Sequence, residues 1–586
     1  MHSSAYFLRM VQRLQGRSVA KPFRFFFTVA GTVAMLATAW KSVQFGLFTV
    51  TLDLLIKLVI TFAYTHGLSG TRRGTLWPSA SKPDPLVEAC HLLEPDSPSE
   101  NGFPSCEEKS SPVSVAPAIP RITACAVGWR EDAELYRRCL QCFATDPICG
   151  PIVAGVDGDT PADQEMVDIF METFPDAHVI RLPETLAATM EQYMLSAQLS
   201  DVEDAPTCEF IMEHLTSKIR ALINEQTSFA AIRDARGLCV VQPHQSKKDI
   251  LFTTLVVAGV VSNELGLEYV FSTDSDSAIV PGGLEQVVAL FDRDVNTGGV
   301  SGHLRFVHPT ETYLSRMVGA HFWFEQEIAK AQGAIFGAVE IQPGPSAGFR
   351  VTALQLVLVP WYCQRMFGQK MITNEDRHLT TRLLWAGFEV HYAPGAIVYT
   401  DTPNTFRGWL KQQIRWARGT MTETLWFPWM LTRLSPLHVY NILKARSVPI
   451  MTFWAITLYA LGFGKEISVR LAPLADVCCA LALQVVYLAC ASPDRPTRPD
   501  LLWLAPSIVW FFFMTPAIYV WSLVTIFDHS WGNAPRGLEP ASEKGQPAGS
   551  RFAALLLEVK QMGFQVLWIG ILCVAALRAC RVSSFV

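Results

Sequence analysis

The chain has 586 residues, of which 50% are hydrophobic and 17% charged, and its formal net charge is -5. Ordinary soluble domains carry about 25% charged residues, so the low charge indicates that long apolar segments are present. The negative net charge argues against a nucleic-acid partner, because such partners select basic surfaces.

Six apolar segments approach the length of about 20 residues that a helix needs to cross a bilayer. From the N-terminus they are residues 25–40, 44–64, 447–464, 472–491, 501–527 and 562–579. The second follows the first so closely that we do not expect a cleaved signal peptide. The pattern predicts a polytopic membrane protein whose soluble domain is inserted between transmembrane helices.

Basic residues lie on both sides of the first two predicted spans: Arg9, Arg13, Arg17, Lys21 and Arg24 before them, Arg72 and Arg73 after them. The positive-inside rule then places the N-terminus and the soluble domain in the cytoplasm. The second span contains Asp53 and Lys57, one helical turn apart. Charges within a membrane are often functional, but we favour an i,i+4 pair that faces the bundle interior.

Residues 67–120 are expected to form a linker, since this stretch is rich in Pro, Ser and Glu and shows no periodicity. A soluble domain follows at 121–403. Apolar runs alternate there with helical patterns, and the runs read "RITACAVGW", "PIVAGVDG", "HVIRL", "LCVVQP" and "LEYVFSTDSDS". Such alternation predicts βαβ units and an α/β fold with a mostly parallel sheet.

Carboxylates follow two of these runs, at the sheet edge where open α/β folds bind ligands. Asp157 ends one run, and Asp274 and Asp276 end another. Continued strand geometry points Asp274 and Asp276 to the same side, and paired carboxylates suit a hard divalent cation that also binds phosphates. Each pattern also occurs in ordinary turns, so neither identifies a site by itself.

Two predicted helices start with further charged residues. In "ITNEDRHLTTRLLWAG", Glu375 and Asp376 either complement the helix dipole or provide a general base near a metal–phosphate site. In "QPHQSKKDILFTT", Lys247 and Lys248 either hold an anion or form a solvated helix start.

The stretch "KQQIRWARGT" at 411–420 places three unusual side chains on one helical face, because Gln412, Arg415 and Trp416 are spaced i, i+3 and i+4. An amide, a guanidinium and an indole form a poor core stripe. They form a suitable wall for an anionic or sugar ligand.

Taken in order, these motifs resemble those of processive family 2 glycosyltransferases. They are V-D-G, S-K-K, D-S-D, G-P-S-A-G-F-R, N-E-D-R-H-L-T and Q-Q-I-R-W. "EDRHLTTRLLWAGFEV" and "TPNTFRGWLKQQIRWARG" are especially similar to hyaluronan synthases, with chitin synthases next, and "SWGNAPRG" at 530–537 is similar to their Ser-Trp-Gly-Thr motif. The resemblance extends over nearly all of 121–537 and the flanking spans.

The resemblance implies a GT-A fold, a UDP-sugar donor (UDP-GlcNAc, UDP-GlcA or UDP-Glc) and Mg²⁺ or Mn²⁺. It implies that Asp376 is the catalytic base beside Glu375, and that Asp274 and Asp276 organise the metal and the diphosphate. The other residues expected to bind donor or acceptor are Asp157, Lys247, Lys248, Ser346, Arg377, Gln412, Arg415 and Trp416, and Trp531 is expected to lie in a gating loop over the nucleotide.

The implied activity is that of an inverting hexosyltransferase that extends a polysaccharide and extrudes it across the bilayer. The alternatives are a chitin or glucan-type synthase that uses one UDP-sugar and, more remotely, a transporter with a nucleotide-sensing domain. The transporter leaves Asp376 and the Gln-x-x-Arg-Trp helix unexplained. Three departures from the hyaluronan synthase pattern concern the choice of sugar: Ser346 in place of Cys, Gly128–Trp129 in place of Ala-Tyr, and Asn533 in place of Thr.

The predicted organisation is as follows: a basic cytoplasmic N-terminus at 1–24, two transmembrane helices within 25–66, the linker 67–120, a cytoplasmic catalytic domain at 121–403, interfacial helices at 404–446 and a membrane channel region at 447–586. The plasma membrane is the expected location.

Segment 501–527 poses a problem of topology. A single crossing there would place Trp531 outside the cell, although Arg536, Lys544, Arg551 and Lys560 favour the inside. Pro506 and Pro516 are expected to interrupt the helix. We therefore predict an interfacial or re-entrant helical segment that returns the chain to the active site.

Overall fold

The computed structural model describes residues 49–69, 119–199, 202–306, 312–366, 369–463, 471–490, 498–528 and 548–583. The predicted span 25–40, most of the predicted linker and the loop 530–537 with Trp531 lie outside the described residues.

A sheet of nine strands, counted over the described residues, forms the centre of the domain in the order β3-β4-β2-β1-β5-β8-β7-β11-β6. Pairing is parallel from β3 through β4, β2 and β1 to β5, and again between β7 and β11, whereas β8 and β6 run antiparallel to their neighbours. The prediction of an α/β fold with a mostly parallel sheet is confirmed. The strands are β1 (Ile122–Gly128), β2 (Cys149–Asp157), β3 (His178–Arg181), β4 (Gly237–Gln242), β5 (Tyr269–Asp274), β6 (Ala278–Ile279), β7 (Thr297–Phe306), β8 (Ala347–Arg350) and β11 (Glu389–Thr400).

Helices cover both faces of the sheet, because successive strand residues point to opposite sides. In β1, Cys125 and Val127 enter one core cluster and Ala124 and Ala126 enter the other. One layer contains α5 (Ala133–Ala144), α6 (Gln164–Thr173) and α11 (Gly283–Arg293). The other contains α7 (Leu186–Ser196), α8 (Ala205–Gln226), α9 (Phe229–Ala235), α10 (Lys247–Leu265), α14 (Val351–Tyr362) and α15 (Glu375–Trp385).

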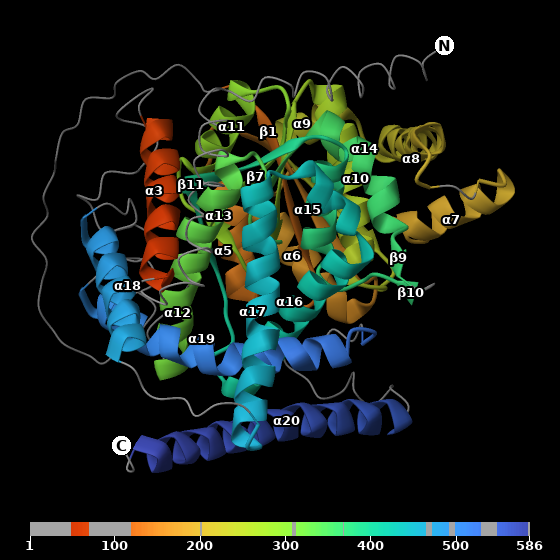
Figure 1. Ribbon diagram of the computed structural model, residues 1–586. Helices are drawn as coiled ribbons and strands as arrows, with labels where there is room; N and C mark the ends of the chain where they lie inside the picture. The colour runs from red at the N-terminus through yellow and green to blue at the C-terminus, as the bar shows by residue number, and fades with distance from the viewer. Residues whose placement is uncertain are drawn as a thin grey trace, which may run out of the picture.

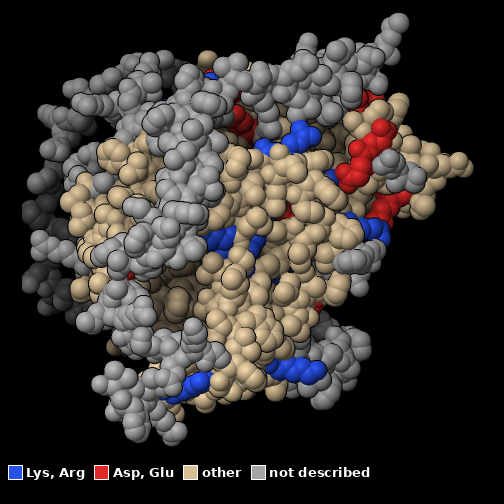
Figure 2. All heavy atoms as spheres, in the orientation of Figure 1, with Lys and Arg blue, Asp and Glu red and all other residues tan. Residues whose placement is uncertain are grey.

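A second group of helices adjoins the sheet domain: in Figure 1, α3 and α18 lie at its left and α19 and α20 below it, with α20 farthest. Its members are α3 (Thr49–Ser69), α12 (Tyr313–Trp323), α13 (Lys330–Ile335), α16 (Phe406–Trp426), α17 (Pro436–Ala460), α18 (Leu471–Cys490), α19 (Arg498–Val524) and α20 (Ala548–Ser583). Figure 2 shows acidic side chains gathered near α7 and α8, whereas the centre and the bottom of this face carry separate Lys and Arg side chains on a largely uncharged surface.

Two helices in the described part of the chain are long and apolar enough to cross a membrane, Leu502–Val524 and Val559–Cys580. The apolar helix Ala475–Cys490 is shorter. The predicted segments 501–527 and 562–579 are thus matched by long apolar helices, and the number of crossings stays a prediction.

The expected interruption of segment 501–527 is wrong, because α19 is one helix that contains both Pro506 and Pro516. A proline removes one helical hydrogen bond, and neighbouring elements can keep the helix intact around it. In α19 this support comes from α12, α16 and α17, which all pack against it.

Helix α3 is joined to distant parts of the chain by polar contacts. Asp53 pairs with Lys57 at 3.1 Å and with Lys444 of α17 at 2.8 Å, so the favoured i,i+4 pair is present. Asp476 of α18 accepts hydrogen bonds from the backbone N–H groups of Val50 and Thr51, both at 2.9 Å. Figure 1 shows α3 and α18 side by side.

Candidate active site

Asp157 ends β2 with its side chain buried at the carboxyl edge of the sheet. Its Oδ1 accepts hydrogen bonds from Gln245 N at 3.2 Å and from Gln242 Nε2 at 3.4 Å, and its Oδ2 lies 2.8 Å from His244 Nδ1. The ring of His244 stacks on that of Trp129, with 4.3 Å between centroids. A carboxylate with an aromatic pair above it therefore stands at this edge.

A cluster of opposite charges lies at the end of β5. Lys247 Nζ is 2.7 Å from Asp274 Oδ1 and 3.5 Å from Glu375 Oε1, so the starts of α10 and α15 meet at this strand. Burial lowers the pKa of Lys247, but the attraction of Asp274 and Glu375 outweighs it and the pKa is raised. Burial raises the pKa of Glu375, while Lys247 acts in the opposite direction. The lysine thus stays charged and can meet an anion.

Asp276 is buried two residues after Asp274, and its Oδ1 accepts a hydrogen bond from the Ser277 hydroxyl at 2.8 Å. Within the described residues no group of three or more His, Cys, Asp or Glu side chains could hold a metal ion. Two carboxylates nevertheless fit Mg²⁺ or Mn²⁺, since such ions often take only one or two protein carboxylates and complete their shell with phosphate oxygens and water. Binding of a metal ion here would depend on a bound diphosphate that supplies the remaining ligand oxygens.

The loop that contains Gly344 passes close over this carboxylate pair. A Cβ at Gly344 would come within 3.0 Å of Asp274 Oδ1, so any side chain would crowd the carboxylate. Ser346 in the same loop is fully buried and packs against Gly302. Its Oγ has no hydrogen-bond partner among the described residues.

Glu375 and Asp376 begin α15, which follows Asn374 in the left-handed conformation (φ 56°, ψ 44°). The backbone N–H of Arg377 donates to Asp376 Oδ1 at 2.7 Å, at the positive end of the helix dipole. The Arg377 guanidinium pairs with Glu340 at 3.4 Å. Asp376 is thus held beside the Lys247 cluster.

Helix α16 is attached to this helix start by side-chain contacts. Asn374 Nδ2 donates to the carbonyl oxygens of Arg415 at 3.0 Å and Trp416 at 3.3 Å. A Cβ at Gly419 would come within 2.6 Å of Asn374 Cβ and closer still to its amide. Only glycine lets the two segments approach this closely.

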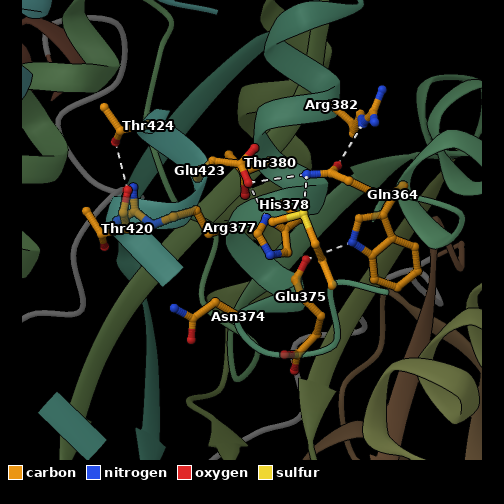
Figure 3. A network of polar contacts seen from close by, with 12 residues as sticks. Gln364, Asn374, Glu375, Arg377, His378, Thr380, Arg382, Thr420, Glu423 and Thr424 are labelled. Atoms are coloured by element: carbon orange, nitrogen blue, oxygen red, sulfur yellow. Dashed lines mark hydrogen bonds and ion pairs between the residues drawn. The ribbon is translucent and has the colours of Figure 1, made fainter. Parts of the chain in front are cut away.

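A second attachment lies one turn further along both helices. His378 Nδ1 contacts Glu423, and His378 Nε2 lies 3.1 Å from the Thr373 carbonyl oxygen. Figure 3 shows how Gln364 and Arg382 extend this buried network. Burial raises the pKa of Glu423, but His378 outweighs this and the pKa is lowered.

Because α16 is attached in this way, the face of Gln412, Arg415 and Trp416 is fixed relative to Asp376. Trp416 lies against Phe322 of α12, with 5.9 Å between ring centroids. The Oε1 atom of Gln412 is buried and has no hydrogen-bond partner in the part of the chain that the structure describes. Asn374 thus holds the backbone of this face, while the indole of Trp416 packs on α12.

Lys248 departs from its expected position on the ligand side. Its side chain is fully buried, and Nζ donates to the carbonyl oxygens of Trp361 at 3.0 Å and Met371 at 2.7 Å. One residue further along a helix turns the side chain by about 100°. The expected ligand contact is therefore replaced by a structural one behind the site.

The end of α19 reaches α16 next to this site. Arg418 donates to Asp528 O at 2.8 Å and to Thr525 Oγ1 at 2.9 Å, and pairs with the Asp528 carboxylate at 3.2 Å. Asp528 precedes Trp531 by three residues in the sequence. Trp531 itself lies outside the described residues.

Sequence reasoning missed the contacts that join these elements. Asn374 and His378 lie within the N-E-D-R-H-L-T motif, which was the available signal, but nothing in the sequence paired them with Gly419 and Glu423. The stacking of His244 on Trp129 was also missed.

Residues 269–524 match the model of glycosyl transferase family group 2. This part of the chain is similar to the family 2 glycosyltransferases. Hyaluronan synthase 3 of Mus musculus is 26% identical over 318 residues, which cover 53% of this chain and 52% of that protein. Hyaluronan synthase 2 of Xenopus laevis is 25% identical over 311 residues, which cover 52% of each. The chain thus spans about half the length of the curated relatives it matches.

The solved structure of a mannosyltransferase from Pyrobaculum calidifontis, in complex with GDP-Man and Mn²⁺, aligns with a TM-score of 0.36 and 14% identity over 82% of this chain and 100% of that one. A likeness at this level does not bear on activity or metal. The predicted resemblance to processive family 2 glycosyltransferases of the hyaluronan synthase type is confirmed by the sequence comparisons.

Proposed function

We propose that this family 2 glycosyltransferase is a processive membrane enzyme that transfers sugar from a UDP-sugar to a growing polysaccharide and passes the product across the membrane. One observation carries the proposal. The Lys247–Asp274–Glu375 cluster stands at the carboxyl edge of the sheet beside Asp376, and Asn374 holds the Gln412–Arg415–Trp416 face against the same helix start.

The donor would lie along the carboxyl edge of the sheet, with its base near Asp157 and its diphosphate near Lys247. Asp274 and Asp276 would hold Mg²⁺ or Mn²⁺, which would supply positive charge for the diphosphate leaving group. Lys247 and Arg415 would bind the same oxygens as charge develops on them. Because these donors are fixed before the reaction, little reorganisation is needed.

Asp376 would take the proton from the acceptor hydroxyl as that oxygen attacks the anomeric carbon from the face opposite UDP. The bond from the anomeric carbon to the diphosphate oxygen breaks and the configuration inverts. Trp416 would stack on the acceptor sugar, whose C–H face is apolar. The Trp531 loop would cover the nucleotide.

The membrane part of the proposal is supported by the long apolar helices and by the packing of α19 on α16. We propose that the active site faces the cytoplasm at the plasma membrane, where UDP-sugars are available. Segment 501–527, which is one continuous helix, would then return the chain to that side as an interfacial helix.

The experiment uses purified full-length protein in detergent with UDP-GlcNAc, UDP-GlcA and UDP-Glc, singly and in mixtures, with Mg²⁺, with Mn²⁺ or with a chelator. A polymer that requires two donors supports the hyaluronan type, and a polymer from one donor supports the chitin or glucan type. UDP release without polymer under every condition would contradict processive synthesis.

Asp376→Asn supplies the matched control. We expect it to abolish polymer formation while UDP binding stays within a few-fold of wild type, because a general base acts in the transition state and adds little to ground-state affinity. Substantial turnover by the folded variant would refute its assignment as the base.

A further inference from the structure

Three residues from adjacent strand ends meet at one end of the candidate site. Trp129 follows β1, Asp157 ends β2 and His244 lies two residues beyond β4, and these strands are neighbours in the order β4-β2-β1. Ligands of open α/β sheets bind at such carboxyl ends. Lys247, three residues after His244, pairs with Asp274, where the diphosphate of the donor is proposed to bind.

The contacts within this group are those of a filled site. The imidazole of His244 lies on the Trp129 ring at 4.3 Å and 15° between planes. Its Nδ1 is 2.8 Å from Asp157 Oδ2 and 3.1 Å from the Asp157 carbonyl oxygen. The His244 side chain is 45% exposed, whereas that of Asp157 is 3% exposed. The histidine thus covers a buried acceptor from the solvent side.

Imidazole and uracil share the two features that this site engages. Each is a flat ring that can stack on an indole, and each presents a ring N–H that can donate to a carboxylate. A uracil that stacked on Trp129 and donated its N3–H to Asp157 would need the surface and the acceptor that His244 now uses. Both rings cannot occupy them together.

We propose that His244 occupies the nucleobase position of the donor site in the free protein and leaves it when the uracil of a UDP-sugar binds Asp157 and Trp129. This inference rests on the proposed function, because it takes the ligand to be a uridine nucleotide. His244 is then a residue that lowers donor affinity by competition.

The charges around His244 determine how firmly it holds this position. Asp157 faces the imidazole from β2 and raises the pKa of His244, and Asp163 adds to the effect although burial opposes it. Arg130 lies over the Trp129 ring at 5.1 Å, and its charge is paired with Asp163 at 2.8 Å. A protonated imidazole donates a stronger, charge-assisted hydrogen bond to Asp157 than a neutral one. The site therefore opens as pH rises through the raised pKa.

The test is equilibrium binding of UDP to the full-length protein in detergent with Mg²⁺, measured by calorimetry between pH 5.5 and 8.5, values that bracket the ordinary histidine pKa of about 6.5. We expect His244→Ala to tighten UDP binding by about three- to tenfold below the pKa of His244, because a competent state that is only partly populated weakens apparent affinity in proportion. We also expect the variant to lose the rise in affinity with pH that wild type shows.

Two further variants separate the explanations. His244→Phe keeps a stacking ring without an N–H donor, so it should retain part of the competition but none of the pH dependence. Asp157→Asn should weaken UDP binding, since it removes the charged acceptor for the base. Thermal unfolding of each variant in the same detergent shows whether the fold is retained.

The outcomes distinguish the two proposals. Wild type that binds no UDP at any pH would overturn the proposed function. UDP binding that Asp157→Asn weakens, but that His244→Ala leaves unchanged or also weakens, would overturn the competition by His244 and leave the donor site standing.

Discussion

Gly419→Ala tests whether the junction between α15 and α16 positions the catalytic groups. The added methyl would meet Asn374 Cβ at 2.6 Å and its amide at a still shorter distance. The two groups must separate by about 1 Å or more to reach van der Waals contact. Asn374 then loses its hydrogen bonds to the carbonyl oxygens of Arg415 and Trp416.

The magnitude follows from these losses. Overpacking a close contact costs about 1–3 kcal/mol, and each of the two neutral hydrogen bonds contributes about 1 kcal/mol, so we expect a loss of stability of about 3–5 kcal/mol. We expect turnover to fall by more than the loss of folded protein alone would cause. Misplacement of catalytic groups by about 1 Å lowers turnover by as much as 100-fold.

The assay compares thermal unfolding in detergent and UDP release per folded molecule. Gly570→Ala in α20 is the matched control, because a Cβ there meets nothing within 4 Å. Asn374→Gly in the Gly419→Ala background removes the clashing amide and suits the left-handed backbone, so it should recover stability but not full turnover. A Gly419→Ala protein as stable and active as Gly570→Ala would refute the reasoning.

Two further predictions concern single side chains. Trp416→Ala should reduce polymer length at least several-fold while UDP affinity changes little, because the indole is proposed to contact the acceptor. Size-exclusion analysis of the product measures the polymer length, and an unchanged length would contradict this prediction. Burial lowers the pKa of Lys248 to about 7 in the folded state, whereas the unfolded state has the ordinary pKa of about 10.4. Between these two values the unfolded state binds more protons than the folded state, so the free energy of unfolding rises with pH. Wild type should therefore gain stability relative to Lys248→Met as pH rises from 7 towards 10, and parallel stability curves for the two proteins would show that the ammonium is not desolvated.

The strands of the sheet, and the edge at which its acidic residues lie, were predictable because both depend on local sequence patterns. Alternating apolar runs identified strands, and a carboxylate that follows a parallel strand lies at a known edge. Asp157 and Asp274 were placed at that edge by this argument alone, whereas Lys247 was predicted only at the start of a helix. The structure brings Lys247 and Asp274 within 2.7 Å.

Contacts between distant segments were not predictable from one sequence. The approach of Gly419 to Asn374 depends on how two helices pack, and the 44 residues between them carry no sign of it. Lys248 was grouped with Lys247 because they are adjacent, although a helix turns successive side chains in different directions. Pro506 and Pro516 were expected to interrupt a helix that the structure shows whole and packed against α16 and α17.

The contact of Asp476 with α3 has a consequence for the order in which the chain is assembled. Helix α3 is synthesised more than 400 residues before Asp476, so the contact between them forms only after α18 has been made. In the membrane arrangement proposed above, where an unsatisfied backbone group costs several kcal/mol, α3 would gain this contact only when α18 is inserted. A nascent chain that ends before residue 476 would leave α3 exposed to quality-control proteases, whereas one that extends past α18 would protect it.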